Sequence, residues 1–120
     1  MLNKRSNREF GALGEARVAK YLEDQGYILI EKNWRISDGE IDLVLHAPDG
    51  RIVFTEVKAR TSQAFGHPLE AITSAKAQRM RKLALAWLML HNQWSRPFRI
   101  DAAAVIGDEK FTIDYREAVA

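Results

Sequence analysis

Charged residues interrupt two apolar segments of this chain, and a short turn signal separates the segments. Gly39-Glu40-Ile41-Asp42 opens the first segment, Glu56-Val57-Lys58 closes the second, and Pro48-Asp49-Gly50 lies between them. Desolvating a charged side chain is unfavourable, so charges inside strands require mutual pairing or a ligand. The pattern therefore predicts two antiparallel strands that bring Asp42, Glu56 and Lys58 to one place.

The length of the connecting loop decides which residues face one another. With Pro48-Asp49-Gly50 as a three-residue loop, glycine takes the left-handed position and Asp42 faces Glu56. Opposed residues have Cβ atoms about 4.5 to 5.5 Å apart, and Lys58 lies two residues further along the same face. A four-residue loop would instead pair Asp42 with Thr55 and place the two acids on opposite faces.

The other segments predict a single α/β domain over residues 1–120, with disorder only in the first few residues. Because the long second helix can carry the chain to a parallel strand, we expect a central mixed five-stranded sheet flanked by helices. The expected helices span residues 7–25 and 74–92, and the expected strands span residues 27–34, 40–45, 51–58, 98–106 and 111–115.

Composition narrows the class of protein further. The chain has no cysteine, which excludes disulfides, thiolate zinc sites and a cysteine nucleophile, and which fits a reducing compartment. The apolar run Leu83–Leu90 is too short to span a bilayer, and no apolar secretory segment follows the basic N-terminus. We therefore expect a cytoplasmic protein without a membrane partner.

The net charge is only +2, but the basic residues are unevenly distributed. They crowd the N-terminal segment, where Lys4 and Arg5 lie, and the second helix. We interpret them as contacts to nucleic acid, although two ordinary solvated helix faces would give the same pattern. The candidate nucleic-acid contacts are Arg35, Arg60, Lys76, Arg79, Arg81 and Lys82.

The chemistry of the hairpin acids favours a divalent metal site. Two adjacent carboxylates stay ionised at neutral pH only if a cation intervenes or a pKa rises. Mg²⁺, or Mn²⁺ in its place, suits Asp42, Glu56 and the main-chain carbonyl of Val57, because it takes a few carboxylate oxygens and completes its shell with water and phosphate. Lys58 would then orient the attacking water or stabilise charge on the phosphate.

A purely structural interpretation of the same residues remains open. Lys58 would neutralise Glu56, while Asp42 would cap a turn or pair with Arg35 or Arg60. An acid two residues before a lysine is common, so this tripeptide alone is weak evidence.

The chain resembles a known bacterial family, UPF0102 (YraN-like), over nearly its whole length. That family is similar to the restriction endonuclease-like PD-(D/E)xK superfamily and, within it, to archaeal Holliday junction resolvases. The resemblance rests on Gly14-Glu15, Ala19, Tyr21-Leu22, Gly26-Tyr27, Asn33-Trp34-Arg35, Gly39-Glu40-Ile41-Asp42-Leu43, Glu56-Val57-Lys58-Ala59-Arg60, Phe65-Gly66, Lys76 and Arg99-Ile100-Asp101.

This resemblance implies a restriction endonuclease-like fold and Mg²⁺ dependence. It implies that Glu15 is the helix acid of the site, Asp42 and Glu56 are the metal ligands, and Lys58 is the catalytic lysine. Asp42 follows Ile41 where proline is usual, a departure that the superfamily tolerates.

Three functional hypotheses follow. The leading one is a Mg²⁺-dependent endonuclease acting on DNA, with branched or otherwise structured DNA as a candidate substrate. The others are a nucleic-acid-binding module that does not cleave, and an intracellular interaction protein with a structural ion network. Junction-cleaving relatives act as dimers, so a homodimer is also compatible with the sequence, although Trp94 is more simply explained as packing at a helix end than as an interface.

Overall fold

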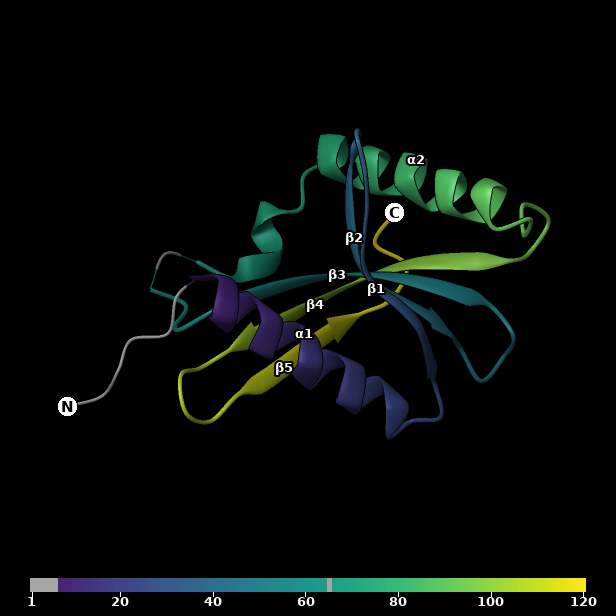
Figure 1. Cartoon of the computed structure of the whole chain (residues 1–120). Helices are drawn as coiled ribbons and strands as arrows, with labels where there is room; N and C mark the ends of the chain where they lie inside the picture. Colours follow the sequence, from purple (N-terminus) through teal and green to yellow (C-terminus); the bar gives the residue numbers. More distant parts are fainter. Residues whose placement is uncertain (1–6, 65) are drawn as a thin grey trace.

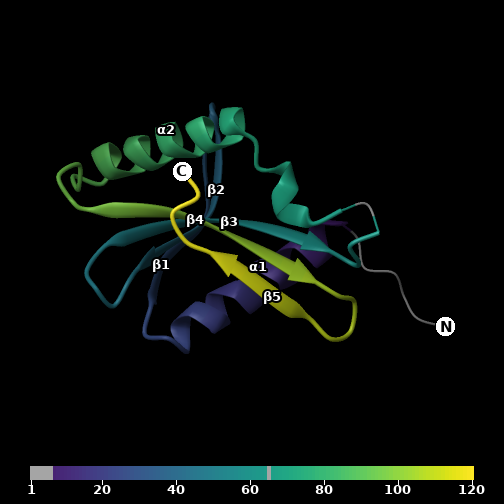
Figure 2. The ribbon, with the colours of Figure 1, turned by 180° about the vertical axis from the view of Figure 1, so that it is seen from behind.

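The computed structural model describes residues 7–64 and 66–120 and shows a five-stranded sheet with one α-helix on each face (Figures 1 and 2). The expected disorder of the first few residues, together with Lys4, Arg5 and Phe65, falls outside the described residues. In chain order the elements are α1 (Asn7–Glu23), β1 (Ile28–Ile36), β2 (Gly39–His46), β3 (Ile52–Arg60), the 3-10 helix η1 (Pro68–Ala71), α2 (Ser74–Leu90), β4 (Phe98–Ile106) and β5 (Thr112–Arg116).

The sheet is mixed, as the sequence predicts. Its strands follow the order β1-β2-β3-β4-β5, and β3 and β4 form its parallel pair. The crossover between those two strands contains α2, which confirms the expected role of the long helix. The crossover also contains η1, a 3-10 helix that the sequence analysis did not predict.

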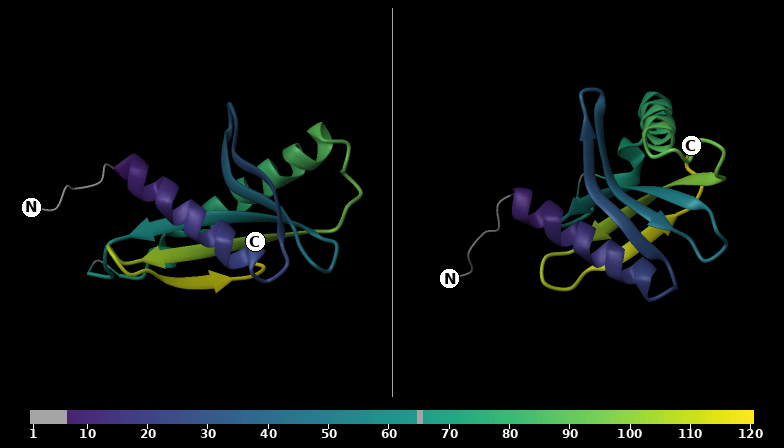
Figure 3. Two further views of the ribbon diagram at one scale, coloured as in Figure 1. Left: turned by 60° about the horizontal axis from the view of Figure 1, so that its bottom comes forward. Right: turned by 45° about the vertical axis from the view of Figure 1, so that its right-hand side comes forward.

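Two apolar cores lie on opposite faces of the sheet. On one face Val18 and Leu22 of α1 pack with Leu43 and Val105, and on the other the α2 residue Trp87 is buried with its neighbours. Figure 3 shows the two helices on either side of the sheet and the β1–β2 hairpin projecting from it beside α2. None of the helices in the described residues is both long and apolar enough to cross a membrane.

The β2–β3 hairpin has the three-residue loop expected from the sequence. Gly50 adopts a φ of +93°, and the Ala47 N–H donates to the Arg51 carbonyl at 2.8 Å. The register pairs His46 with Ile52 and continues to Leu43 and Thr55. The four-residue alternative is therefore wrong. The predicted next pair, Asp42 with Glu56, is not formed because the pairing ends at Thr55.

Trp94 differs from expectation. The residue is 75% exposed, and Met89 and Leu90 at the end of α2 are exposed as well. The interpretation of Trp94 as a packed helix-end residue is therefore wrong, because the main chain turns at Asn92 with a φ of +56° and carries Trp94 away from the core.

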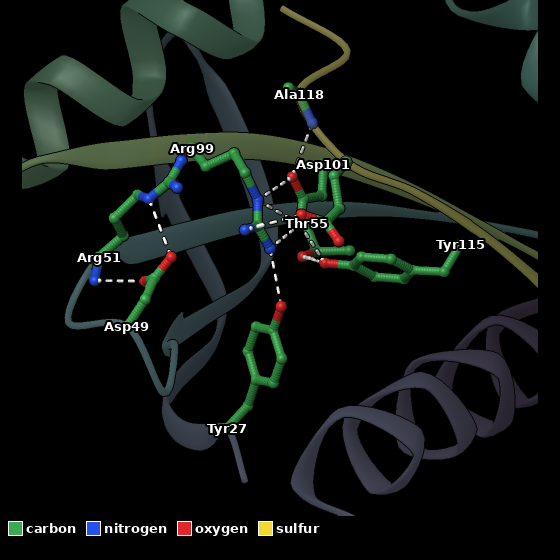
Figure 4. A network of polar contacts seen from close by, with 9 residues as sticks. Tyr27, Asp49, Arg51, Thr55, Arg99, Asp101, Tyr115 and Ala118 are labelled. Carbon is green, nitrogen blue, oxygen red and sulfur yellow. Dashed lines mark hydrogen bonds and ion pairs between the residues drawn. The ribbon is translucent and has the colours of Figure 1, made fainter. Parts of the chain in front are cut away.

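A buried ion pair joins the C-terminal half of the sheet (Figure 4). The Arg99 guanidinium donates to both carboxylate oxygens of Asp101 at 2.9 Å, and the Asp101 side chain is fully buried. Tyr115 on β5 donates its hydroxyl to the same carboxylate, as does the Ala118 N–H at 3.0 Å. The carboxylate thus connects β4, β5 and the C-terminal segment.

Removing this carboxylate should strongly destabilise the fold. In Asp101→Ala the Arg99 guanidinium, whose side chain is 8% exposed, would stay buried without its main partner. We expect a loss of about 3 to 5 kcal/mol in the free energy of unfolding, measured by urea denaturation. Glu117→Ala is the matched control, because Glu117 also binds Arg99, at 2.9 Å, but its side chain is 60% exposed. That variant should lose less than about 1 kcal/mol, and equal losses would contradict a dominant role for Asp101.

Candidate functional site

The site lies where β2 separates from β3. Along β2, Leu43 and Leu45 face α1 while Val44 faces α2, but Ile41 also faces α2. Side chains normally alternate along a strand, so the alternation shifts at Asp42. By the β1–β2 register Asp42 stands opposite Asn33, whose φ is +53°. Asparagine tolerates this left-handed conformation better than most residues. The shift at Asp42 and the left-handed Asn33 therefore make β2 and β1 irregular at the same level of the sheet.

Three carboxylates meet at this irregularity. Glu15 of α1 and the β2 residues Glu40 and Asp42 each offer an oxygen, and these oxygens lie within 4.8 Å of one another. Gly14 allows the helix to come this close to the sheet, since a Cβ there would stand 3.0 Å from the Ala59 Cβ. Asn33 donates its side-chain amide to Glu15 and holds that carboxylate in place.

Asp42 is the most perturbed acid of the group. The residue is 8% exposed, and its carboxylate accepts the Val57 N–H at 2.8 Å. Burial, reinforced by the negative charge of Glu56, raises the pKa of Asp42 to about 8. Burial is also the main reason that the pKa of Glu15 lies above its ordinary value. Among the described residues the charges that act most strongly on Asp42 are those of Glu56, Glu15 and Glu40, so this carboxyl group favours either a proton or a cation.

Glu56 and Lys58 lie beside the three carboxylates and bind each other. The Lys58 ammonium is 3.1 Å from a Glu56 oxygen, and both side chains are largely buried. Glu56 does not belong to the closest group of acids, but it lies near enough for its charge to act on Asp42. The N–H and C=O of a strand residue point toward the same neighbouring strand. The Val57 carbonyl is therefore expected to point toward Asp42.

The purely structural interpretation of Asp42, Glu56 and Lys58 is correct in part. Lys58 does neutralise Glu56, as that alternative required. Arg35, however, donates from Nε to Glu40 at 2.8 Å, and Arg60 donates to the Ala59 carbonyl at 2.7 Å. The ion pairing suggested for Asp42 with these two arginines is therefore not what the structure shows.

The six predicted nucleic-acid contacts fall into different environments. Lys76 and Arg79 line a cavity of about 190 Å³ together with Glu56 and Lys58. Arg81 instead lies over the Phe98 ring, 5.3 Å from its centroid. The remaining residues are exposed: Arg35, Arg60 and Lys82.

Sequence reasoning missed two residues of the site, the acid Glu40 and its neighbour Asn33. Glu40 lies two positions before Asp42, and this spacing places residues on one face of a strand, so the spacing alone could have identified it. Asn33 contributes through a left-handed main-chain conformation, and only its being an asparagine inside a strand segment hinted at this.

The fold belongs to the class of endonuclease-like α/β proteins. A solved structure described as a repair endonuclease from Pyrococcus abyssi superposes with a TM-score of 0.50 and 17% sequence identity. The match covers 90% of this chain and 42% of that protein. The chain therefore spans less than half the length of that endonuclease, and the likeness concerns the fold.

The chain belongs to the uncharacterised protein family UPF0102, whose sequence pattern matches residues 14–105. A UPF0102 protein of Renibacterium salmoninarum is 50% identical over 103 residues, covering 85% of this chain and 86% of the relative. A UPF0102 protein of Beutenbergia cavernae is 48% identical over 103 residues with the same coverage. The family membership implied by the sequence motifs is thereby confirmed.

The raised pKa of Asp42 predicts an unusual dependence of stability on pH. Its folded-state pKa of about 8 exceeds the unfolded value of about 3.9, so the folded state binds the proton more tightly. This contribution to stability is complete below the unfolded pKa and is lost as the pH rises through the folded pKa. In chelator at about pH 8.5, Asp42→Asn should be more stable than the wild type by roughly 1 to 3 kcal/mol.

Urea denaturation at about pH 8.5 and about pH 5 measures this effect, and the advantage of Asp42→Asn should shrink at the lower pH. Asp24→Asn is the control, because Asp24 is 65% exposed and pairs only with Lys20 among the ion pairs seen here. An advantage of equal size at both pH values would show that ionisation of Asp42 does not limit stability.

Proposed function

We propose that this protein is a Mg²⁺- or Mn²⁺-dependent endonuclease that hydrolyses phosphodiester bonds in DNA, with branched or otherwise structured DNA as its preferred substrate. Such an enzyme would act in the cytoplasm, the compartment expected from the sequence. The proposal builds on the endonuclease-like fold and on the acids and lysine gathered where β2 leaves β3.

One observation carries the proposal. Asp42 is buried among Glu15, Glu40 and Glu56, and each of these neighbours raises its pKa. A structural ion network would place a cation next to the most buried acid, because an uncompensated buried charge is strongly unfavourable. Here two cations bind the outer acids instead, Arg35 on Glu40 and Lys58 on Glu56. Within residues 7–64 and 66–120, the ion pairs thus leave Asp42 itself without a cationic partner, which a divalent ion would provide.

The residues present fit such an ion. Mg²⁺ prefers oxygen ligands, and Glu15, Glu40 and Asp42 already bring one oxygen each within 4.8 Å of the others. We assign Asp42 as the central ligand, with the Val57 carbonyl and Glu56 within reach from β3. A bound ion would supply Lewis-acid polarisation of the phosphate and a water of lowered pKa.

The protein's own side chains would perform the remaining tasks. Lys58, held in place by Glu56, would donate to the attacking water or to the phosphate oxygen on which charge develops. Arg35 and Arg60, with the cavity-lining α2 residues Lys76 and Arg79, would bind the phosphates on either side, giving affinity that falls with salt and depends little on sequence. A homodimer would place two such sites on a symmetric substrate.

Metal binding provides the first test. Two sets of ligands are compared: Glu15, Glu40 and Asp42 from the acidic group, and Asp42, Glu56 and the Val57 carbonyl as predicted from the sequence. Mn²⁺ should bind the wild type, and Asp42→Asn should abolish binding measured by isothermal titration calorimetry, because Asp42 belongs to both sets. Glu40→Gln should weaken binding about tenfold or more. Glu56→Gln separates the two sets: a comparable loss makes Glu56 a ligand, and unchanged affinity restricts it to holding Lys58. Unchanged affinity in Asp42→Asn would refute the site.

Cleavage provides the second test. Purified protein with Mn²⁺ should cleave a four-way junction in preference to linear duplex, and Lys58→Ala should lower the rate about a hundredfold or more while metal affinity persists. Lys82→Ala is the matched control, because it removes an equal charge from an exposed position. Equal activity of Lys58→Ala and the wild type would point to a contaminating nuclease, and binding without cleavage would favour the non-cleaving module.

A further inference from the structure

The cavity between β3 and α2 has a composition that the metal site does not explain. It has a volume of about 190 Å³, and its lining contains three cations, Lys58, Lys76 and Arg79, and three acids, Asp38, Glu40 and Glu56. Two of these acids have cationic partners, since Glu56 binds Lys58 and Glu40 binds Arg35, which is not part of the lining. With Asp38 as the remaining acid, Lys76 and Arg79 together bring one positive charge to this cavity beyond those two ion pairs.

Lys58 and Lys76 approach each other inside this cavity. The charge of Lys58 is the main reason that the pKa of Lys76 lies below its ordinary value. Two ammonium groups repel when they lie close together. The negative charge of Glu56 acts in the opposite direction and raises the pKa of Lys76. An anion between the ammonium groups would relieve the repulsion, as an oxyanion with several acceptor oxygens does best.

The start of α2 holds this arrangement in place. Thr73 caps the helix by accepting the Lys76 N–H at 3.2 Å, which fixes the first turn. Lys76 and Arg79 are three residues apart and so lie on one face of the helix, beside Met80 and Leu83, which also line the cavity. The N-terminal end of a helix carries partial positive charge, which adds to the attraction for an anion near these residues.

We propose that Lys58, Lys76 and Arg79 form a subsite for one phosphodiester group of the DNA strand, next to the acidic centre. The subsite rests on the proposed endonuclease function, because the phosphate that it binds belongs to the proposed substrate. It assigns different roles to cations of one helix: Lys76 and Arg79 bind this phosphate, whereas Arg81 packs on Phe98 and Lys82 faces solvent.

Two substitutions of equal charge test the subsite. Lys76→Gln and Lys82→Gln each remove one positive charge from α2, and only Lys76 lines the cavity. Binding of a short fluorescein-labelled single-stranded oligodeoxynucleotide is measured by anisotropy in EDTA over a range of salt concentrations. We expect Lys76→Gln to weaken binding about five- to tenfold and to reduce the slope of log K against log salt by about 0.7. Lys82→Gln should stay within about twofold of the wild type.

Further measurements separate this subsite from a structural role and from the metal site. Lys76→Arg should retain binding, because it keeps the charge, and Lys76→Gln should keep the wild-type melting temperature and Mn²⁺ affinity. Equal effects of Lys76→Gln and Lys82→Gln, with cleavage by the wild type intact, would overturn the subsite while the endonuclease stands. A selective loss in Lys76→Gln, with no divalent ion supporting cleavage, would support the subsite and overturn the endonuclease.

Discussion

The buried ion pair of Arg99 and Asp101 holds the sheet together next to Thr55, the residue beyond which β2 and β3 no longer pair. Thr55 of β3 aligns with Asp101 on one side and with Leu43 of β2 on the other. The Thr55 hydroxyl also lies 3.0 Å from the Tyr115 hydroxyl, which itself donates to Asp101. Thr55 is thus the last level at which β2, β3 and β4 are all in register, and the polar network fixes β3 at that level.

β2 and β3 separate beyond Thr55. This separation forms the opening between the two strands and leaves the Asp42 carboxylate buried beside it. A continued ladder would satisfy the next main-chain N–H groups with carbonyl oxygens, whereas here the Val57 N–H is bound by the Asp42 carboxylate. One hydrogen bond compensates only part of the desolvation of the carboxylate of Asp42, a residue that is 8% exposed. The remaining unfavourable energy is the physical reason that this position selects a proton or a cation.

Local signals predicted the fold better than they predicted the site. The turn chemistry of Pro48-Asp49-Gly50 fixed the register, and apolar runs located every strand to within a few residues. The missing pair of Asp42 and Glu56 was not predictable in this way, because hairpin counting assumes that pairing continues. The left-handed conformation of Asn33, which stands opposite Asp42 across the sheet, was not predictable either. Such features arise from contacts between strands, and one strand's pattern does not contain them.

Charge is divided across the opening in a way that restricts what can fill it. α1 and β2 supply Glu15, Glu40 and Asp42, while β3 and α2 supply Lys58, Lys76 and Arg79 together with one acid, Glu56, which is paired with Lys58. A cation alone would relieve the acids and leave the lysines repelling each other, and an anion alone would do the reverse. A divalent ion together with a phosphate satisfies both sides at once, since the phosphate oxygens can bind the ion and the ammonium groups together. The division of charge thus supports the proposed phosphate chemistry rather than simple storage of a metal ion.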